Sequence, residues 1–340
     1  MARATRGLQR FKSSRRHVVK NVEVDRCGKL FIEGFSPPMT ELLEFEARKQ
    51  GFEVVHDQSQ AISLSLDPKE GFANNGSRIA VISEPKVVLP EIYSERVLRS
   101  FKSTIAVSVE RAAEIKTTNF AEIQPIPTAQ GKWPKSRRNR TCAIFGNKFS
   151  ANVNSNYGLR RKSLILDETN CNKIDMYGVD WLDPLWLQAK RRIYSIRKQI
   201  HTLGELSMKE ALGDFCFVPK NYKGIMGFHM EQLFEYETSL VIENQSDYNS
   251  EKLWNSLVAG AVPIYVGSSL LRKDLKELVI EVERSPEAII EKVNNVSIKE
   301  INEKRERTRE FLKEYDFQAQ LRNSAAKLIE ITRKIIVSNV

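Results

Sequence analysis

Short apolar runs and helix-spaced apolar groups alternate along most of the chain. The runs at Phe52–Val55, Arg78–Ser83, Thr141–Phe145 and Ile174–Tyr177 are short and bounded by turn residues, which is typical of buried strands. Between such runs lie segments with apolar residues at helical spacing, such as Met39–Gln50, which is followed by a glycine stop. This β/α alternation predicts an α/β protein with doubly wound parallel sheets.

The most regular example of this alternation spans residues 238–267. A predicted strand at Thr238–Ile242 leads into a polar turn, and Ser250 is a suitable N-cap for a helix at Glu251–Ala259. Gly260 then ends the helix, and Val262–Val266 reads as the next strand. The stretch therefore predicts a βαβ unit, in which ligands bind outside the carboxyl ends of the strands.

Polar side chains gather at that strand end. The free N–H groups and the positive dipole end of the following helix favour an anion, and Lys252 lies one residue inside the helix. The simplest ligand with an anionic centre, and with hydroxyls for the glutamates, is a nucleoside diphosphate sugar. The predicted donor-binding residues of this turn are Glu243, Asn244, Tyr248, Glu251 and Lys252, with Asp247 beside them.

The same residues carry a resemblance. Three parts of this stretch together resemble the donor-binding motif of the α1,3/4-fucosyltransferases. They are Glu243-Asn244, the run from Asp247 to Lys252, and Ala259-Gly260-Ala261-Val262-Pro263 with Gly267. The resemblance implies a GT-B fold, in which two Rossmann-like domains face each other across a cleft. It also implies an inverting enzyme that transfers fucose from GDP-fucose to a glycan hydroxyl. Ser250, Asn249, Ile242 and Glu237 depart from the usual family pattern and bear on the choice of donor sugar.

The resemblance extends less closely to the other half of the site. Glu84 follows a predicted strand and precedes Pro85, where the fold would place a catalytic base and where the family carries a glutamate that deprotonates the acceptor. Glu91, Glu95 and Glu110 are lesser candidates for this base.

The resemblance also implies a basic residue upstream of the Glu-Asn pair that is directed at the donor diphosphate. Lys220 and Lys223 both suit this role, and the sequence does not choose between them. Arg160 and Arg161 fall where the family has a helix arginine, and we interpret them as structural residues rather than donor contacts.

The length of 340 residues, 41% of them hydrophobic, predicts two domains. Residues 131–140 are polar, basic and interrupted by Gly131 and Pro134, which is typical of a linker. We predict an acceptor-side domain at 21–130 and a donor domain at 141–310. Residues 311–340 are expected to form a C-terminal helix that crosses back to the first domain, as in GT-B proteins, with self-association as the alternative.

The positive charge is concentrated in two segments. Residues 1–20 hold seven Lys or Arg and residues 131–140 hold five, and neither segment contains an acid. Because the net charge is +10, the other 310 residues sum to about −2. This near-neutral body argues against a specific nucleic-acid-binding protein. We predict that residues 1–20 form a disordered tail, with peripheral contact to a membrane or an acidic polymer as the alternative.

Other features indicate where the protein works and whether it needs a metal. No apolar run approaches the roughly 20 residues that span a bilayer, and the N-terminus lacks a signal-peptide core. The four cysteines have neither metal-binding nor disulfide-framework spacing, so we expect a cytoplasmic protein, at most peripheral to a membrane. No D-x-D sequence occurs, and no metal or other cofactor is predicted. The rival functions are transfer from another nucleotide sugar and non-catalytic polymer binding on the same fold.

Overall fold

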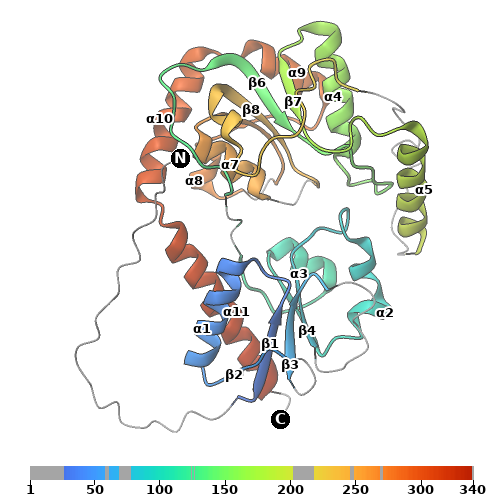
Figure 1. Ribbon diagram of the computed structural model, residues 1–340, viewed down its shortest axis with the longest axis vertical. Helices are drawn as coiled ribbons and strands as arrows, with labels where there is room; N and C mark the ends of the chain where they lie inside the picture. Colours follow the sequence, from blue (N-terminus) through green and yellow to red (C-terminus); the bar gives the residue numbers. More distant parts are fainter. Residues whose placement is uncertain are drawn as a thin grey trace, which may run out of the picture.

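The protein is described here by a computed structural model, which covers residues 27–57, 61–68, 78–123, 125, 127–201, 218–245, 249–268 and 271–338. In these ranges the strands form two five-stranded parallel sheets, one above the other in Figure 1. The first sheet has the order β2-β1-β3-β4-β5. Its strands are β1 (Lys29–Glu33), β2 (Glu53–Val54), β3 (Ile62–Leu66), β4 (Arg78–Ile82) and β5 (Ser103–Ala106).

The second sheet repeats this topology. Its order is β10-β9-β8-β6-β7, so in both sheets the first strand of the unit lies between the second and the third. The strand order reverses at this point, between β1 and β3 and between β6 and β8, and α/β sheets bind ligands at such switch points. The strands are β6 (Arg138–Ile144), β7 (Ile174–Tyr177), β8 (Tyr236–Ile242), β9 (Val262–Val266) and β10 (Ile280–Glu281).

Helices cover the sheets, which is why their central strands are buried along their whole length. Every residue of β4 and of β9 is buried, as expected for parallel strands with both faces covered. The first unit holds α1 (Pro37–Lys49), η3 (Pro90–Tyr93), α2 (Glu95–Leu98) and α3 (Val109–Ile115). The second holds α4 (Tyr157–Asn170), α5 (Leu185–His201), η4 (Glu231–Glu235), α7 (Glu251–Ala259), α8 (Lys273–Lys276) and α9 (Pro286–Asn295). The predicted α/β class is confirmed.

The C-terminal helical region serves both units. α10 (Ile298–Glu314) lies on the second unit, where Ile301 packs with Val262 and Ile280. α11 (Phe317–Val337) then runs down to the first unit and packs against α1 (Figure 1). Its residues Leu328 and Ile329 are fully buried in the core of the first sheet. The C-terminal helix therefore completes the first unit.

One predicted boundary is wrong. The linker predicted at 131–140 overlaps β6, which begins at Arg138. Two of its five basic residues are strand residues with acidic partners: Arg138 pairs with Glu235, and Arg140 pairs with Asp175 at 2.8 Å. The linker was predicted to end too late because the acidic partners of Arg138 and Arg140 lie far away in the sequence.

Two further features of the described residues concern cysteines and membranes. Cys142 and Cys171 are free thiols, the Cys27 thiol donates to the carbonyl of Gln50 at 3.4 Å, and Cys216 lies outside the described residues. Among the helices of the described ranges, none combines the length and the apolar composition that a bilayer crossing requires.

Candidate functional site

A cavity of about 320 Å³ opens between the two sheets. The first unit contributes Glu84 and Val88 to its wall, and the second unit contributes the remaining residues. Ile144 and Gly146 come from the end of β6 and Asn244 from the end of β8, so the cavity lies at the switch point of the second sheet. The predicted GT-B arrangement, two Rossmann-like units facing each other across a cleft, is thereby confirmed.

The βαβ unit has the predicted elements, and it brings Lys252 to the cavity. β8, α7 and β9 end where the sequence indicated, with Ser250 as the N-cap and Gly260 at φ +68° after the helix. Lys252 lines the cavity, and its side chain is 22% exposed. Its amine donates to Ser250 Oγ at 3.0 Å and lies 3.6 Å from Glu251 Oε1. The cation is therefore held at the start of α7, close to the positive end of the helix.

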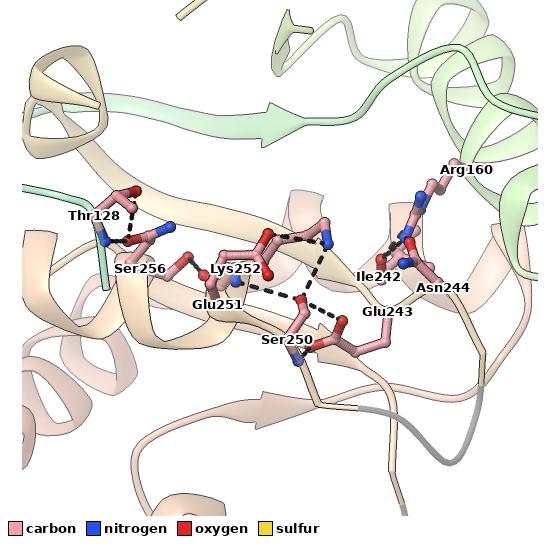
Figure 2. A network of polar contacts seen from close by, with 10 residues as sticks. Thr128, Arg160, Ile242, Glu243, Asn244, Ser250, Glu251, Lys252 and Ser256 are labelled. Carbon is pink, nitrogen blue, oxygen red and sulfur yellow. Dashed lines mark hydrogen bonds and ion pairs between the residues drawn. The ribbon is translucent and has the colours of Figure 1, made fainter. Parts of the chain in front are cut away.

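Glu243 supports this helix start from beneath. It is fully buried, Ser250 N–H donates to its Oε1 at 2.9 Å, and the Ser250 hydroxyl donates to its Oε2 at 2.6 Å (Figure 2). Burial raises the pKa of this carboxyl, and the charge of Lys252 opposes the rise. The structure thus connects Glu243 to Lys252 through one hydroxyl, and Glu243 does not line the cavity.

Asn244 reaches the cavity together with Arg160, which the sequence analysis treated as structural. Arg160 comes from α4 and donates to Asn244 Oδ1 at 2.8 Å and, through Nε, to the carbonyl of Ile242 at 3.1 Å (Figure 2). Burial lowers the pKa of this arginine, while the nearby charges of Glu243 and Glu251 raise it. Arg160 braces the end of β8, as expected of a structural residue, and it also lines the cavity.

Lys148 is a cavity residue that the sequence analysis missed. It lies in the loop after β6, four residues beyond the strand end at Ile144, and lines the same cavity as Lys252 and Arg160. The available signal was its place directly after Gly146-Asn147 at a carboxyl strand end. Three cations of the second unit thus line the cavity, beside the carboxylate of Glu251.

Glu84 enters the cavity from the first sheet on a turn that is held by Asp67. The carboxylate of Asp67 accepts from Ser83 N–H at 2.8 Å and from Glu84 N–H at 3.2 Å, and also from the Ser83 hydroxyl. Tyr93 adds a hydrogen bond from its hydroxyl to the carbonyl of Glu84 at 2.7 Å. These contacts fix the backbone of Glu84 and leave its side chain to the cavity. Asp67 was not singled out from the sequence.

The electrostatic environment of Glu84 suits a proton acceptor. Its Oε2 is buried and has no hydrogen-bond partner among the described residues. Burial raises the pKa of Glu84, the negative charges of Asp67 and Glu251 raise it further, and Lys252 and Lys148 oppose this. A carboxylate with a raised pKa is a stronger base than an ordinary glutamate.

The alternative bases are less suited to this position. Glu95 is exposed and pairs with Arg99, and Glu91 does not line the cavity. The side chain of Glu110 lies outside the described residues.

The structure does not bring the two upstream lysines to the cavity. Lys220 is exposed, and its backbone N–H bonds to Glu168. Lys223 is exposed, and its amine lies 3.7 Å from Asp175. Tyr248 lies outside the described residues. Lys148 and Arg160 line the cavity, whereas Lys220 and Lys223 do not.

A second, larger cleft of about 540 Å³ lies at the switch point of the first sheet. Leu66 from the end of β3, Phe35 from the turn after β1 and Val107 from the end of β5 line it. Ser83, which immediately precedes Glu84, also faces this cleft. Its lining is mostly apolar, whereas the cavity of the second sheet is rich in charge. The two sheets thus hold dissimilar sites on either side of the Glu84 turn.

No group of three His, Cys, Asp or Glu side chains among the described residues is arranged to hold a metal ion. The absence of a metal requirement stays a prediction.

Comparison with known proteins gives similarity at the level of fold. No family model and no curated protein matches the sequence. A solved trehalose-6-phosphate synthase, OtsA, matches at 12% identity with a TM-score of 0.46, over 89% of this chain and 77% of that one. An α,α-trehalose-6-phosphate synthase from Burkholderia multivorans matches at 11% identity with a TM-score of 0.45, over 90% and 78%. The fucosyltransferase resemblance therefore rests on the residues of the βαβ unit.

Proposed function

We propose that the protein is an inverting glycosyltransferase that moves a sugar from a nucleoside diphosphate to a hydroxyl of an acceptor glycan. One observation carries the proposal: a carboxylate from one sheet and three cations from the other line a single cavity. The second unit is then the donor domain and the first unit the acceptor domain. This division of labour accords with the charged and apolar character of their respective clefts.

On the donor side, negative charge develops on the departing diphosphate as the glycosidic bond breaks. The cations at that place are Lys252, Lys148 and Arg160, and the start of α7 adds its dipole. Because Lys252 and Arg160 are held in position by hydrogen bonds before the reaction, they stabilise the leaving group with little reorganisation. We infer that no divalent metal is obligatory.

On the acceptor side, Glu84 takes the proton of the attacking hydroxyl. The acceptor oxygen bonds to the anomeric carbon as the bond to the diphosphate oxygen breaks, so the configuration inverts. The partnerless Oε2 and the raised pKa of Glu84 support this role. The apolar cleft beyond Ser83 favours an acceptor that carries an apolar group near the reacting hydroxyl.

The identity of the donor rests on the fucosyltransferase resemblance, which favours GDP-fucose. In this assignment Glu251 and Tyr248 hold the ribose, and Asn244 contacts the sugar or the phosphate. Another nucleotide sugar is the alternative, since Ser250, Asn249 and Ile242 depart from the usual motif. One of the similar solved structures is described as bound with UDP-2-fluoro glucose, so uridine nucleotides belong in the test.

The test combines nucleotide binding with donor hydrolysis. The melting temperature is measured with GDP, UDP, ADP and CMP, each with and without Mg²⁺. Of these nucleotides, we expect only GDP to raise the melting temperature, and by the same amount with and without Mg²⁺. If only UDP raised the melting temperature, the donor would be assigned as a uridine-diphosphate sugar and not as GDP-fucose. A shift that needs Mg²⁺ would overturn the metal-free mechanism.

Lys252→Ala tests the donor side directly. Hydrogen bonds to charged groups contribute about 1.5–3 kcal/mol, so we expect transfer or hydrolysis of GDP-fucose to fall about ten- to two-hundred-fold. Lys223→Ala is the matched control, since it removes a lysine outside the cavity, and should leave the rate unchanged. Equal losses in both variants would contradict the assignment of Lys252.

A further inference from the structure

α5 is an amphipathic helix that exposes apolar side chains and buries polar ones. Two of its polar side chains turn toward the body of the protein: Gln188 and Arg192 are each 3% exposed. The guanidinium of Arg192 lies 4.2 Å from the centre of the Phe149 ring, and Gln188 donates to the carbonyl of Asp183 at 2.8 Å. Arg191 pairs with Asp180 at 3.2 Å and also with Asp183.

The opposite side of α5 is apolar and exposed. Trp186, Ile193 and Ile200 recur at seven-residue intervals, so they lie in one line along the helix. They are 67%, 52% and 57% exposed, and Leu185 is similarly exposed at the start of the helix. We call Leu185, Trp186, Ile193 and Ile200 the outer stripe. In Figure 1, α5 lies along the side of the molecule, away from α1 and α11.

Cations border the outer stripe. Lys190 and Arg197 are both exposed and lie one helical position further round, again seven residues apart. α5 contains no aspartate or glutamate, so the stripe and its border present apolar groups and positive charge alone. An aromatic and aliphatic stripe bordered by Lys and Arg is typical of helices that lie in the interface of a bilayer with anionic lipids.

We propose that the outer stripe docks the protein on an anionic lipid surface, with α5 lying in the plane of the membrane. A second copy of the chain suits this face less well, because two such stripes in contact would place Lys190 and Arg197 near like charges without an acid of α5 to pair them. The seven cations of residues 1–20 provide a second, electrostatic attraction to the same surface. Stable anchoring commonly needs two such signals.

The test uses the full chain with vesicles of phosphatidylcholine alone, or of phosphatidylcholine with phosphatidylglycerol. Trp181 and Trp254 are buried and Trp133 is half-buried, so the exposed Trp186 is the tryptophan whose emission a lipid surface changes most. We expect co-flotation and a blue shift with the anionic vesicles, both weakened by salt, and little binding to phosphatidylcholine alone. The combined variant Ile193→Ser with Ile200→Ser should bind at least about tenfold more weakly.

The controls distinguish binding through the outer stripe from non-specific hydrophobic adsorption and from binding through residues 1–20. Phe45→Ser with Ile298→Ser removes two exposed apolar residues elsewhere and should leave vesicle binding unchanged. Deleting residues 2–20 should weaken binding but keep the blue shift. All variants should retain the melting shift with nucleotide, which shows that they fold.

Three results would overturn the proposal. The first is vesicle binding that survives the Ile193 and Ile200 changes and disappears with the tail. The second is a concentration-dependent dimer in sedimentation that the same changes abolish. The third is a free protein in which acrylamide cannot quench the Trp186 emission, since another part of the chain would then cover the stripe.

Discussion

Glu84 combines a fixed backbone with a carboxylate oxygen that has no hydrogen-bond partner in the part of the chain that the structure describes. Asp67 and Tyr93 hold the turn, and neither is bonded to the Glu84 side chain, which faces the cavity. A buried acceptor without a partner is costly, and a substrate hydroxyl would relieve that cost by donating to it. The same Asp67 that positions Glu84 also raises its pKa by its negative charge. At the scale of single residues, Asp67 therefore contributes to both the geometry and the basicity of Glu84, and burial contributes most to the raised pKa.

This arrangement predicts the pH dependence of transfer. Glu84 must be ionised to accept a proton, so kcat/KM should rise with pH through a pKa above the ordinary glutamate value of 4.5. Asp67→Asn removes a negative charge and should move this acid limb to lower pH. Lys148→Met removes a positive charge and should move it to higher pH. Glu84→Gln should lower kcat by about 10²–10⁴-fold.

The measurement is the pH at which the acid limb of the pH–rate profile lies. This pH is independent of the maximal rate of the variant. Shifts of both variants in the same direction would contradict the assignment of Glu84 as the titrating base. A profile of Glu84→Gln that keeps the wild-type limb would do so as well.

At the scale of elements, the start of α7 links the fold to the chemistry. Ser250 caps the helix, and its hydroxyl stands between the buried Glu243 and the amine of Lys252. The cap satisfies a buried carboxylate on one side and orients a cation on the other. The stability of this helix start and the position of the Lys252 amine therefore depend on the same oxygen atom.

Ser250→Ala should lower the free energy of unfolding by about 2–4 kcal/mol. This sum includes the loss of an N-cap and of a hydrogen bond to a buried carboxylate. The affinity for GDP should fall as well, because the Lys252 amine loses its partner. Ser250→Thr keeps the hydroxyl and serves as the control in urea denaturation. If the alanine and threonine variants were equally stable, the hydroxyl would not have this role.

At the scale of the whole molecule, α11 joins the end of the second unit to the core of the first. Leu328 is fully buried beside α1, while Asn323 on the same helix is exposed. Leu328→Ala should cost about 2–5 kcal/mol, and Asn323→Ala less than about 0.5 kcal/mol. Hydrogen exchange is expected to rise in β1–β5 for the leucine variant. Faster exchange confined to β6–β10 would contradict this account of α11.

The fold could be predicted from the sequence because its signals are local. Buried strands such as Ile174–Tyr177 and the capped helix from Glu251 to Ala259 have their apolar periods and stop residues in one short stretch. The same is true of Glu84, which follows a strand and precedes a proline.

The remaining parts of the site depend on contacts that no local pattern records. Glu243 turns inward because Ser250 offers two donors, and Lys223 turns away because Asp175 lies beside it. Lys148 lies in a loop without periodicity, and Asp67 acts through a backbone turn 16 residues further along the chain. Tertiary contacts decide which of these side chains reach the cavity. The sequence does not record those contacts, and it therefore favoured Lys220 and Lys223.

The position of α11 also bears on how the protein is made. The first sheet emerges from the ribosome early, but the side chains that close its core, from Leu321 to Ile336, emerge more than two hundred residues later. At roughly 5–20 residues per second, this leaves an open apolar face on the nascent chain for ten seconds or more. The second sheet, whose strands and covering helices are contiguous in the sequence, can close first. Chaperone dependence and sensitivity to translation speed should therefore concentrate in the earliest-synthesised part of the molecule.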